Sequence, residues 1–165
     1  MRLRATPEDF RVEEVPLFAP AGEGAHTYLE LEKRLRTSDE VARDLARAAG
    51  VAPGDVGYAG RKDRDAVTVQ WMSVPGLDPE QAAALEIPGV RVVRAVPHPH
   101  KLRTGQLAAN RFALVIRELG EDEIARAEDR LAELVALGMP NRFGEQRFGR
   151  AGDNAELGLR ALRGE

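Results

Sequence analysis

The chain has 165 residues, of which 43% are hydrophobic and 31% charged, and its formal net charge is −3. This composition excludes a disordered polar chain and is typical of one folded domain with a moderate core. The chain has no cysteine, which excludes disulfides and thiolate metal sites, and it has no apolar run of the roughly 20 residues that cross a bilayer. Because the N-terminus also lacks the apolar segment of a signal peptide, we expect a cytoplasmic protein.

In the first half of the chain, alternating patterns predict strands at residues 10–15, 26–33 and 67–74. Thr37 and Glu40 form a capping-box pattern, which predicts the start of a helix that Gly50 ends. Residues 51–60 are rich in proline and glycine. We expect them to form an irregular connection that leads to the loop before the third strand.

In the second half, helical patterns occur at residues 79–86, 121–137 and 154–162, and strand patterns at residues 90–96 and 112–119. Asp78 followed by Pro79 is a typical start for the first of these helices, and Gly138 follows the second. Runs of strands with a few helices predict an α+β fold. We expect a mixed, largely antiparallel sheet with helices packed on one side.

The stretch GYAGRKDRDAVTVQ, at residues 57–70, combines a glycine-flanked turn, a charged cluster and a strand. Its two glycines supply backbone freedom, which lets a turn be tight and approach a ligand closely. Asp63 lies between Lys62 and Arg64, and nearby cations favour the ionised form of a carboxyl group. An ionised carboxylate beside a rigid strand could act as a nucleophile. On charge alone, a solvated surface loop is the alternative.

Basic residues gather in one part of the chain despite its negative net charge. Residues 87–117 contain no acidic residue and six basic ones, namely Arg91, Arg94, Lys101, Arg103, Arg111 and Arg117. A locally basic surface suits contact with phosphates and predicts salt-sensitive binding of nucleic acid. The alternative is that these arginines only face solvent at alternate strand positions.

Four motifs of the chain resemble those of the TruD family of tRNA pseudouridine synthases. They are ATPEDFRVEE at 5–14, the stretch at 57–70, KLR at 101–103 with NRF at 110–112, and NRFGEQRFG at 141–149. They occur in the family's order and extend over nearly the whole chain. The resemblance implies an isomerase that converts uridine to pseudouridine in tRNA, at position 13 in the family, with no metal or other cofactor.

The resemblance also implies roles for single residues. Asp63 matches the family's nucleophile, and we favour it over Asp65, whose place in the motif is variable. The predicted substrate-binding residues are Phe10, Lys62, Arg64, Asn110 and Phe112, and the predicted RNA-binding residues are Lys101, Arg103, Arg111 and Arg147. Alternative structural roles exist, since Phe10 and Phe112 suit a core and Asn110 suits a turn. We expect Gln70 to be structural, and His98-Pro99-His100 to be a rigid loop rather than a metal site.

Members of the family are longer than this chain, and carry an inserted domain and a C-terminal segment after the fourth motif. We therefore expect residues 1–165 to be the N-terminal portion of the catalytic domain, with an unpaired sheet edge and an open cleft. A missing C-terminal segment or a second chain would complete it. Two alternatives to a synthase are a non-catalytic RNA-binding module and, with less support, a small-molecule enzyme that binds phosphate near Asp63.

Overall fold

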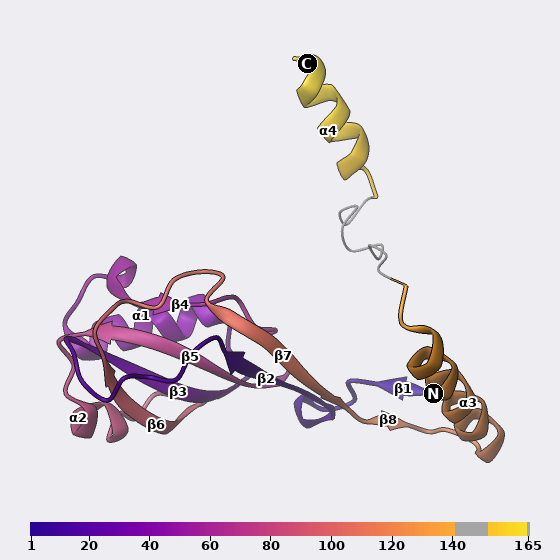
Figure 1. Cartoon of the computed structure of the whole chain (residues 1–165), viewed down its shortest axis with the longest axis horizontal. Coiled ribbons are helices and arrows are strands. Elements are labelled where there is room, and N and C mark those ends of the chain that lie inside the picture. The colour runs from indigo at the N-terminus through magenta and orange to yellow at the C-terminus, as the bar shows by residue number, and fades with distance from the viewer. Residues whose placement is uncertain (141–151, 165) are drawn as a thin grey trace. The chain divides into compact units, whose positions relative to one another are not determined.

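The computed structural model describes residues 1–140 and 152–164 (Figure 1). The chain divides into two compact units, Met1–Leu119 and Gly120–Glu165. The first unit contains the sheet and every predicted site residue that the structure describes. The fourth motif, with the predicted RNA-binding residue Arg147, lies outside the described residues.

A six-stranded sheet forms the centre of the first unit, with the strand order β6-β3-β5-β2-β7 and β4 paired with β5. The strands are β2 (Phe10–Pro16), β3 (His26–Arg34), β4 (Gly57–Tyr58), β5 (Val67–Pro75), β6 (Val90–His98) and β7 (Leu107–Leu114). β2 and β5 are parallel, and every other pair is antiparallel. The predicted mixed, largely antiparallel sheet is confirmed. Two short strands, β1 (Arg2–Leu3) and β8 (Ile116–Arg117), form a separate antiparallel pair.

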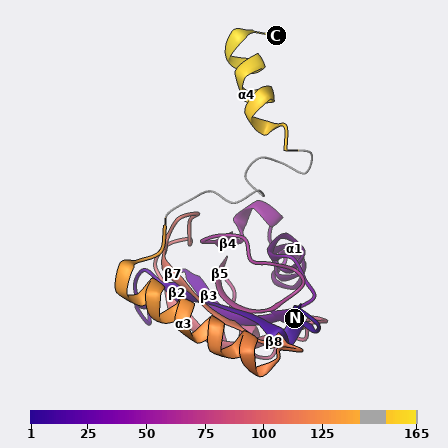
Figure 2. The ribbon, with the colours of Figure 1, turned by 90° about the vertical axis from the view of Figure 1, so that its right-hand side faces the viewer.

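The main core lies between the sheet and two helices, α1 (Ser38–Ala49) and α2 (Pro79–Ala83), on one face. Figure 2 shows α1 beside the strands of the sheet. Most of the core residues come from α1, α2, β3 and β5, and they include Leu29, Leu31, Val41, Leu45, Met72, Val74 and Ala82. The predicted capping box begins α1: the Thr37 hydroxyl accepts from the Glu40 amide, and the Glu40 carboxylate accepts from the Thr37 amide at 2.7 Å. Gly50 ends the helix with a left-handed φ of 68°. The helices of this unit therefore pack on one side of the sheet, as predicted.

The predicted strand at 112–119 is wrong in its bounds. β7 begins five residues earlier, at Leu107, and ends at Leu114, before the separate strand β8. Alanine and asparagine are weak strand formers, so residues 107–110 have no local strand pattern. They are extended because they pair with residues 14–16 of β2. Likewise, β4 lies inside the predicted connection at 51–60, and α2 ends at Ala83 rather than near Glu86.

β7 is an outer strand of the sheet, because among the described residues it pairs only with β2. Its side chains Phe112 and Leu114 are 55% and 54% exposed. Large apolar side chains along a free strand edge are a ready surface for another strand or chain. The unpaired edge that we expected is therefore present in the described part of the chain.

The second unit contains α3 (Glu121–Leu137) and α4 (Asn154–Arg163), close to the predicted bounds of both helices. The Glu123 carboxylate accepts a hydrogen bond from the Gly120 amide at 3.0 Å, at the start of α3. Several apolar side chains of these helices are exposed, including Leu131, Val135, Leu137 and Leu162. None of the helices in the described ranges is long and apolar enough to cross a membrane.

Candidate functional site

The loop at residues 59–66 connects β4 to β5, and the pairing of the strands sets its path. β4 pairs with the end of β5, through Gly57 and Ser73, whereas β2 pairs with the beginning of β5, through Arg11 and Val67. β3 occupies the opposite edge of β5, so β4 and β2 lie on the same edge. The loop therefore turns back beside β2 before β5 begins.

Gly57 is required at the entry to this loop because another segment of backbone lies against it. A Cβ atom at this position would lie 2.2 Å from the Leu102 carbonyl oxygen and 2.6 Å from the Ser73 hydroxyl. The Leu102 amide donates to that hydroxyl at 2.9 Å, which holds the 101–103 segment in place. Our expectation of backbone freedom is wrong for Gly57 and Gly60, since neither has a positive φ. Gly57 is needed for close packing inside the protein.

We predict that Gly57→Ala lowers the free energy of unfolding by about 1–3 kcal/mol, because the added methyl group must displace backbone or the Ser73 side chain. Urea denaturation measures this loss. The control is Gly60→Ala, whose Cβ would have only ordinary contacts, at 3.8 Å. It should change the free energy by no more than about 0.5 kcal/mol. Equal effects from the two variants would contradict the packing argument.

Lys62 is held by a buried ion pair inside the loop. Its ammonium lies 2.6 Å from the Glu14 carboxylate, and the two side chains are 4% and 1% exposed. The Lys62 amide donates to the Ser38 hydroxyl at 3.0 Å, and that hydroxyl donates to the Gln70 side-chain oxygen at 2.6 Å. Gln70 therefore has the structural role that we expected. The charge of Lys62 is paired within the protein, so contact with a substrate phosphate would require this pair to open.

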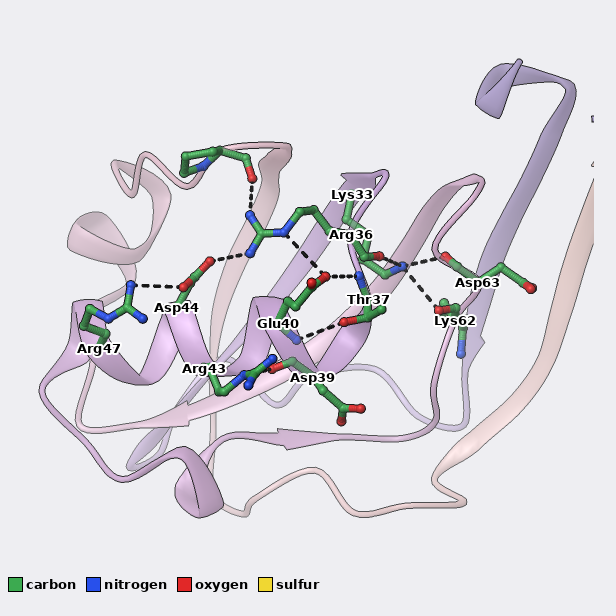
Figure 3. Close-up of polar contacts among 11 residues, drawn as sticks. Lys33, Arg36, Thr37, Asp39, Glu40, Arg43, Asp44, Arg47, Lys62 and Asp63 are labelled. Carbon is green, nitrogen blue, oxygen red and sulfur yellow. Dashed lines mark hydrogen bonds and ion pairs between the residues drawn. The ribbon is translucent and has the colours of Figure 1, made fainter. Parts of the chain in front are cut away.

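Asp63 is exposed next to this buried lysine. Its backbone carbonyl accepts a hydrogen bond from the Lys33 ammonium at 2.8 Å, while its carboxylate points away from that lysine (Figure 3). Arg64 and Asp65 are exposed as well. Among the described residues, no hydrogen bond or ion pair joins the side chain of Arg64 to a partner. The loop thus combines a backbone fixed from inside with charged groups that remain open to solvent.

Three of the predicted substrate-binding residues share one face of β2 and β7. Asn110 lies opposite Glu14 in the strand register, and Phe112 follows two residues later on the same face. Phe10 stacks on Phe112, with ring centroids 6.2 Å apart and an interplanar angle of 17°. Phe10 is 5% exposed and packs in a small core with Ala66 of the loop, so it has the core position that we considered as an alternative. Phe112 is the exposed ring of the pair.

Arg4 was not among the residues that we predicted. Its guanidinium carbon lies 3.9 Å from the centroid of the Phe10 ring, in the range of a cation–π contact. Arg4 also has a positive φ of 52°, which is uncommon for a residue other than glycine. Its place five residues before the buried Asp9 gave no local pattern that would indicate this contact. The structure thus adds a cation to the aromatic pair on β2 and β7.

Asp9 itself anchors the start of β2. Its carboxylate accepts two hydrogen bonds from the Arg117 guanidinium, at 2.7 and 2.9 Å, and one from the Thr6 amide at 3.2 Å. The hydrogen bonds from Arg117 lower the pKa of Asp9 to about 2. This ion pair joins the N-terminal motif to β8. Asp9, the only aspartate of that motif, therefore has a structural role.

The predicted RNA-binding residues do not all lie together. Arg111 projects from the opposite face of β7 to Asn110, and its guanidinium lies 3.3 Å from the Glu13 carboxylate. Lys101 and Arg103 both line a pocket of about 490 Å³, together with Pro53, Gly54 and residues 56–58. The Lys101 ammonium donates to the Gly54 carbonyl. Among the predicted RNA-binding residues that the structure describes, Lys101 and Arg103 therefore line one pocket, and Arg111 does not line it.

His98 has a structural environment. Its Nδ1 atom accepts a hydrogen bond from the Ala21 amide at 3.2 Å, and its ring centroid lies 4.3 Å from that of Tyr28. Burial lowers the pKa of His98, with a further contribution from His100 and His26.

Within residues 1–140 and 152–164, no group of three or more His, Cys, Asp or Glu residues could hold a metal ion.

The fold and the site together define a class of protein. The structure is similar to that of the putative tRNA pseudouridine synthase D from Methanosarcina mazei, with a TM-score of 0.85 and 28% sequence identity. The match covers 99% of this chain and 38% of the other. The chain therefore has the pseudouridine synthase fold. The family model for tRNA pseudouridine synthase D (TruD) matches residues 1–165, so the chain belongs to the TruD family, as its four motifs predicted.

Curated relatives agree with this assignment. The tRNA pseudouridine synthase D of Anaeromyxobacter dehalogenans (strain 2CP-C) is 53% identical over 163 residues, which cover 99% of this chain and 46% of the relative. That of Geobacter metallireducens is 47% identical, over 99% of this chain and 40% of the relative. The chain thus spans less than half the length of the curated relatives that it matches.

Proposed function

We propose that this chain carries the nucleophile and one wall of the substrate pocket of a tRNA pseudouridine synthase. The observation that carries the proposal is the exposed carboxylate of Asp63 on a loop whose backbone is fixed by buried contacts. A carboxylate nucleophile needs this combination, because it must be accessible to the substrate and held in one orientation.

The proposed reaction converts uridine to pseudouridine, at position 13 in the family. The bond from ribose C1′ to uracil N1 breaks, the base turns while it stays in the pocket, and uracil C5 is joined to C1′. C5 loses its proton and N1 gains one, so the product is an isomer of uridine. Asp63 acts as the nucleophile. The reaction also requires the base to leave its stack and enter a pocket from which water is excluded.

The other predicted residues would bind the extruded nucleotide. The exposed ring of Phe112 offers a surface on which a base can stack, worth roughly 1–3 kcal/mol per base. The Asn110 amide can both donate to and accept from a uracil edge. Arg64, Lys101 and Arg103 would contact phosphates of tRNA, which makes binding salt-sensitive.

We also propose that a further segment or a second chain completes the pocket. Two observations support this: the relatives are more than twice as long as this chain, and β7 leaves Phe112 and Leu114 exposed along the sheet edge. The same observations favour a second candidate function, a tRNA-binding module that makes no product by itself. In either case we propose a cytoplasmic location, where tRNA is the partner.

An unmodified tRNA transcript tests both candidates. We expect the chain to bind the transcript at low salt, to lose affinity as salt is raised, and to form pseudouridine at position 13, as measured by mass spectrometry of digested RNA. Binding without product would favour the tRNA-binding module. A chain that binds no tRNA even at low salt would contradict both functions.

A further inference from the structure

Lys33 is the most unusual charged group near the proposed site. It lies on the same face of β3 as Leu29 and Leu31, and it is 1% exposed. Its ammonium donates to three backbone carbonyls: those of Arg36 at 2.7 Å, Asp63 at 2.8 Å and Lys62 at 3.4 Å (Figure 3). An ammonium has three N–H donors, so all of them are used by these carbonyls.

No carboxylate in the described part of the chain lies within 4.0 Å of this ammonium, the distance of an ion pair. Lys33 differs in this respect from Lys62, which has Glu14 as its partner. A buried charge without a paired carboxylate is costly, and an apolar side chain at this position would fill the core at lower cost. Its presence beside the proposed nucleophile indicates a role in the site.

The charged groups around Lys33 come from two elements. Burial and, to a smaller extent, the Lys62 ammonium lower the pKa of Lys33, whereas Asp63 on the loop and Glu40 on α1 raise it, and together these effects place it at about 8. Of the neighbouring charges that favour the ammonium form, Asp63 has the largest effect on the pKa of Lys33. The charge of Lys33 is therefore coupled electrostatically to that of Asp63.

We propose that Lys33 is a positioning residue for the Asp63 nucleophile, an inference that rests on the proposed function. Its ammonium holds the carbonyls of Lys62 and Asp63 from inside the protein and leaves the Asp63 carboxylate free to meet substrate. It also places a fixed positive charge beside the loop that carries this carboxylate.

Loss of the Lys33 proton has a defined consequence. The neutral amine has only two N–H donors, so at least one of the three carbonyls loses its hydrogen bond. The positive charge beside the loop is lost at the same time. The charged form predominates below the pKa of Lys33, so all three hydrogen bonds can form at neutral pH, and at least one is lost as the pH rises through about 8.

NMR titration of the lysine side chains tests the coupling without any assay of activity. In the wild-type chain we expect Lys33 to titrate near pH 8. Asp63→Asn should lower the pKa of Lys33 by about 0.5–1 pH unit, since it removes a neighbouring negative charge. Asp65→Asn, the matched control on the same loop, should leave that pKa unchanged. The proposal is overturned if Lys33 titrates near 10.4, as ordinary lysines do, or if Asp63→Asn has no effect on it.

The pH profile of pseudouridine formation provides a second readout. We expect the activity of the wild-type chain to fall tenfold per pH unit above the pKa of Lys33, and the activity of Lys33→Arg to persist to higher pH, because arginine stays charged. The same alkaline loss in both proteins would overturn the proposal. If the chain forms no pseudouridine, the proposed function fails on its own, and the titration still decides the role of Lys33.

Discussion

Asp63→Ala should abolish pseudouridine formation, with a loss of about ten-thousand-fold or more in the rate constant. Alanine cannot attack the ribose, and removal of a nucleophile leaves only the catalysis that comes from binding. The Asp63 side chain is exposed and the loop contacts use its backbone, so the fold should not change. Affinity for the tRNA transcript should stay within about threefold of wild type, because the phosphate contacts remain.

The matched control for this prediction is Asp65→Ala. Asp65 has the same chemistry, is exposed as well and lies two residues away on the same loop. It should keep at least half of the wild-type rate. Loss of activity in Asp65→Ala but not in Asp63→Ala would exchange the two roles. Equal rates in wild type and Asp63→Ala would exclude Asp63 as the nucleophile.

Glu14→Gln should lower the free energy of unfolding by about 3–5 kcal/mol, the usual result when one partner of a buried ion pair is removed. The Lys62 ammonium would remain 4% exposed with no negative charge to offset its burial. Glu14 also accepts a hydrogen bond from the Trp71 amide at 3.3 Å, which the substitution weakens. Urea denaturation at neutral pH measures the effect.

The adjacent acid gives the control. Glu13 forms an ion pair with Arg111, but its side chain is 50% exposed and that of Arg111 is 70% exposed. Exposed pairs contribute little, so Glu13→Gln should change the free energy of unfolding by no more than about 1 kcal/mol. A similar loss from both variants would show that burial does not set the strength of these pairs.

The alternation of β2 was enough to predict from the sequence that Glu14 is buried and Glu13 is exposed. Glu14 shares its face with Phe10 and Val12, whereas Glu13 faces the other way. The same pattern indicates that Lys33 is buried, because it follows Leu29 and Leu31 at alternate positions of β3. We predicted both strands, but we did not predict that Glu14 and Lys33 are buried on their apolar faces.

The path of the loop around Asp63 could not be predicted in this way. It depends on the parallel pairing of β2 with β5 and on the place of β4 at the same edge, which join segments far apart in the chain. Local patterns carry no information on such pairing. For the same reason the four residues at the start of β7 had no strand pattern of their own. The family motifs indicated Asp63, whereas the contacts that hold its loop are seen only in the structure.

The central position of β2 has a consequence for the order of folding during synthesis. One neighbour of β2 is β7, and the paired residues Glu13 and Arg111 are 98 positions apart in the chain. A ribosome must therefore complete most of the first unit before β2 can acquire both neighbours. Contacts of this range slow folding, so the nascent chain exposes Phe10 and Val12 for longer than a helical domain of equal length would. We expect chaperones that bind extended apolar segments to engage the chain at its N-terminal strand.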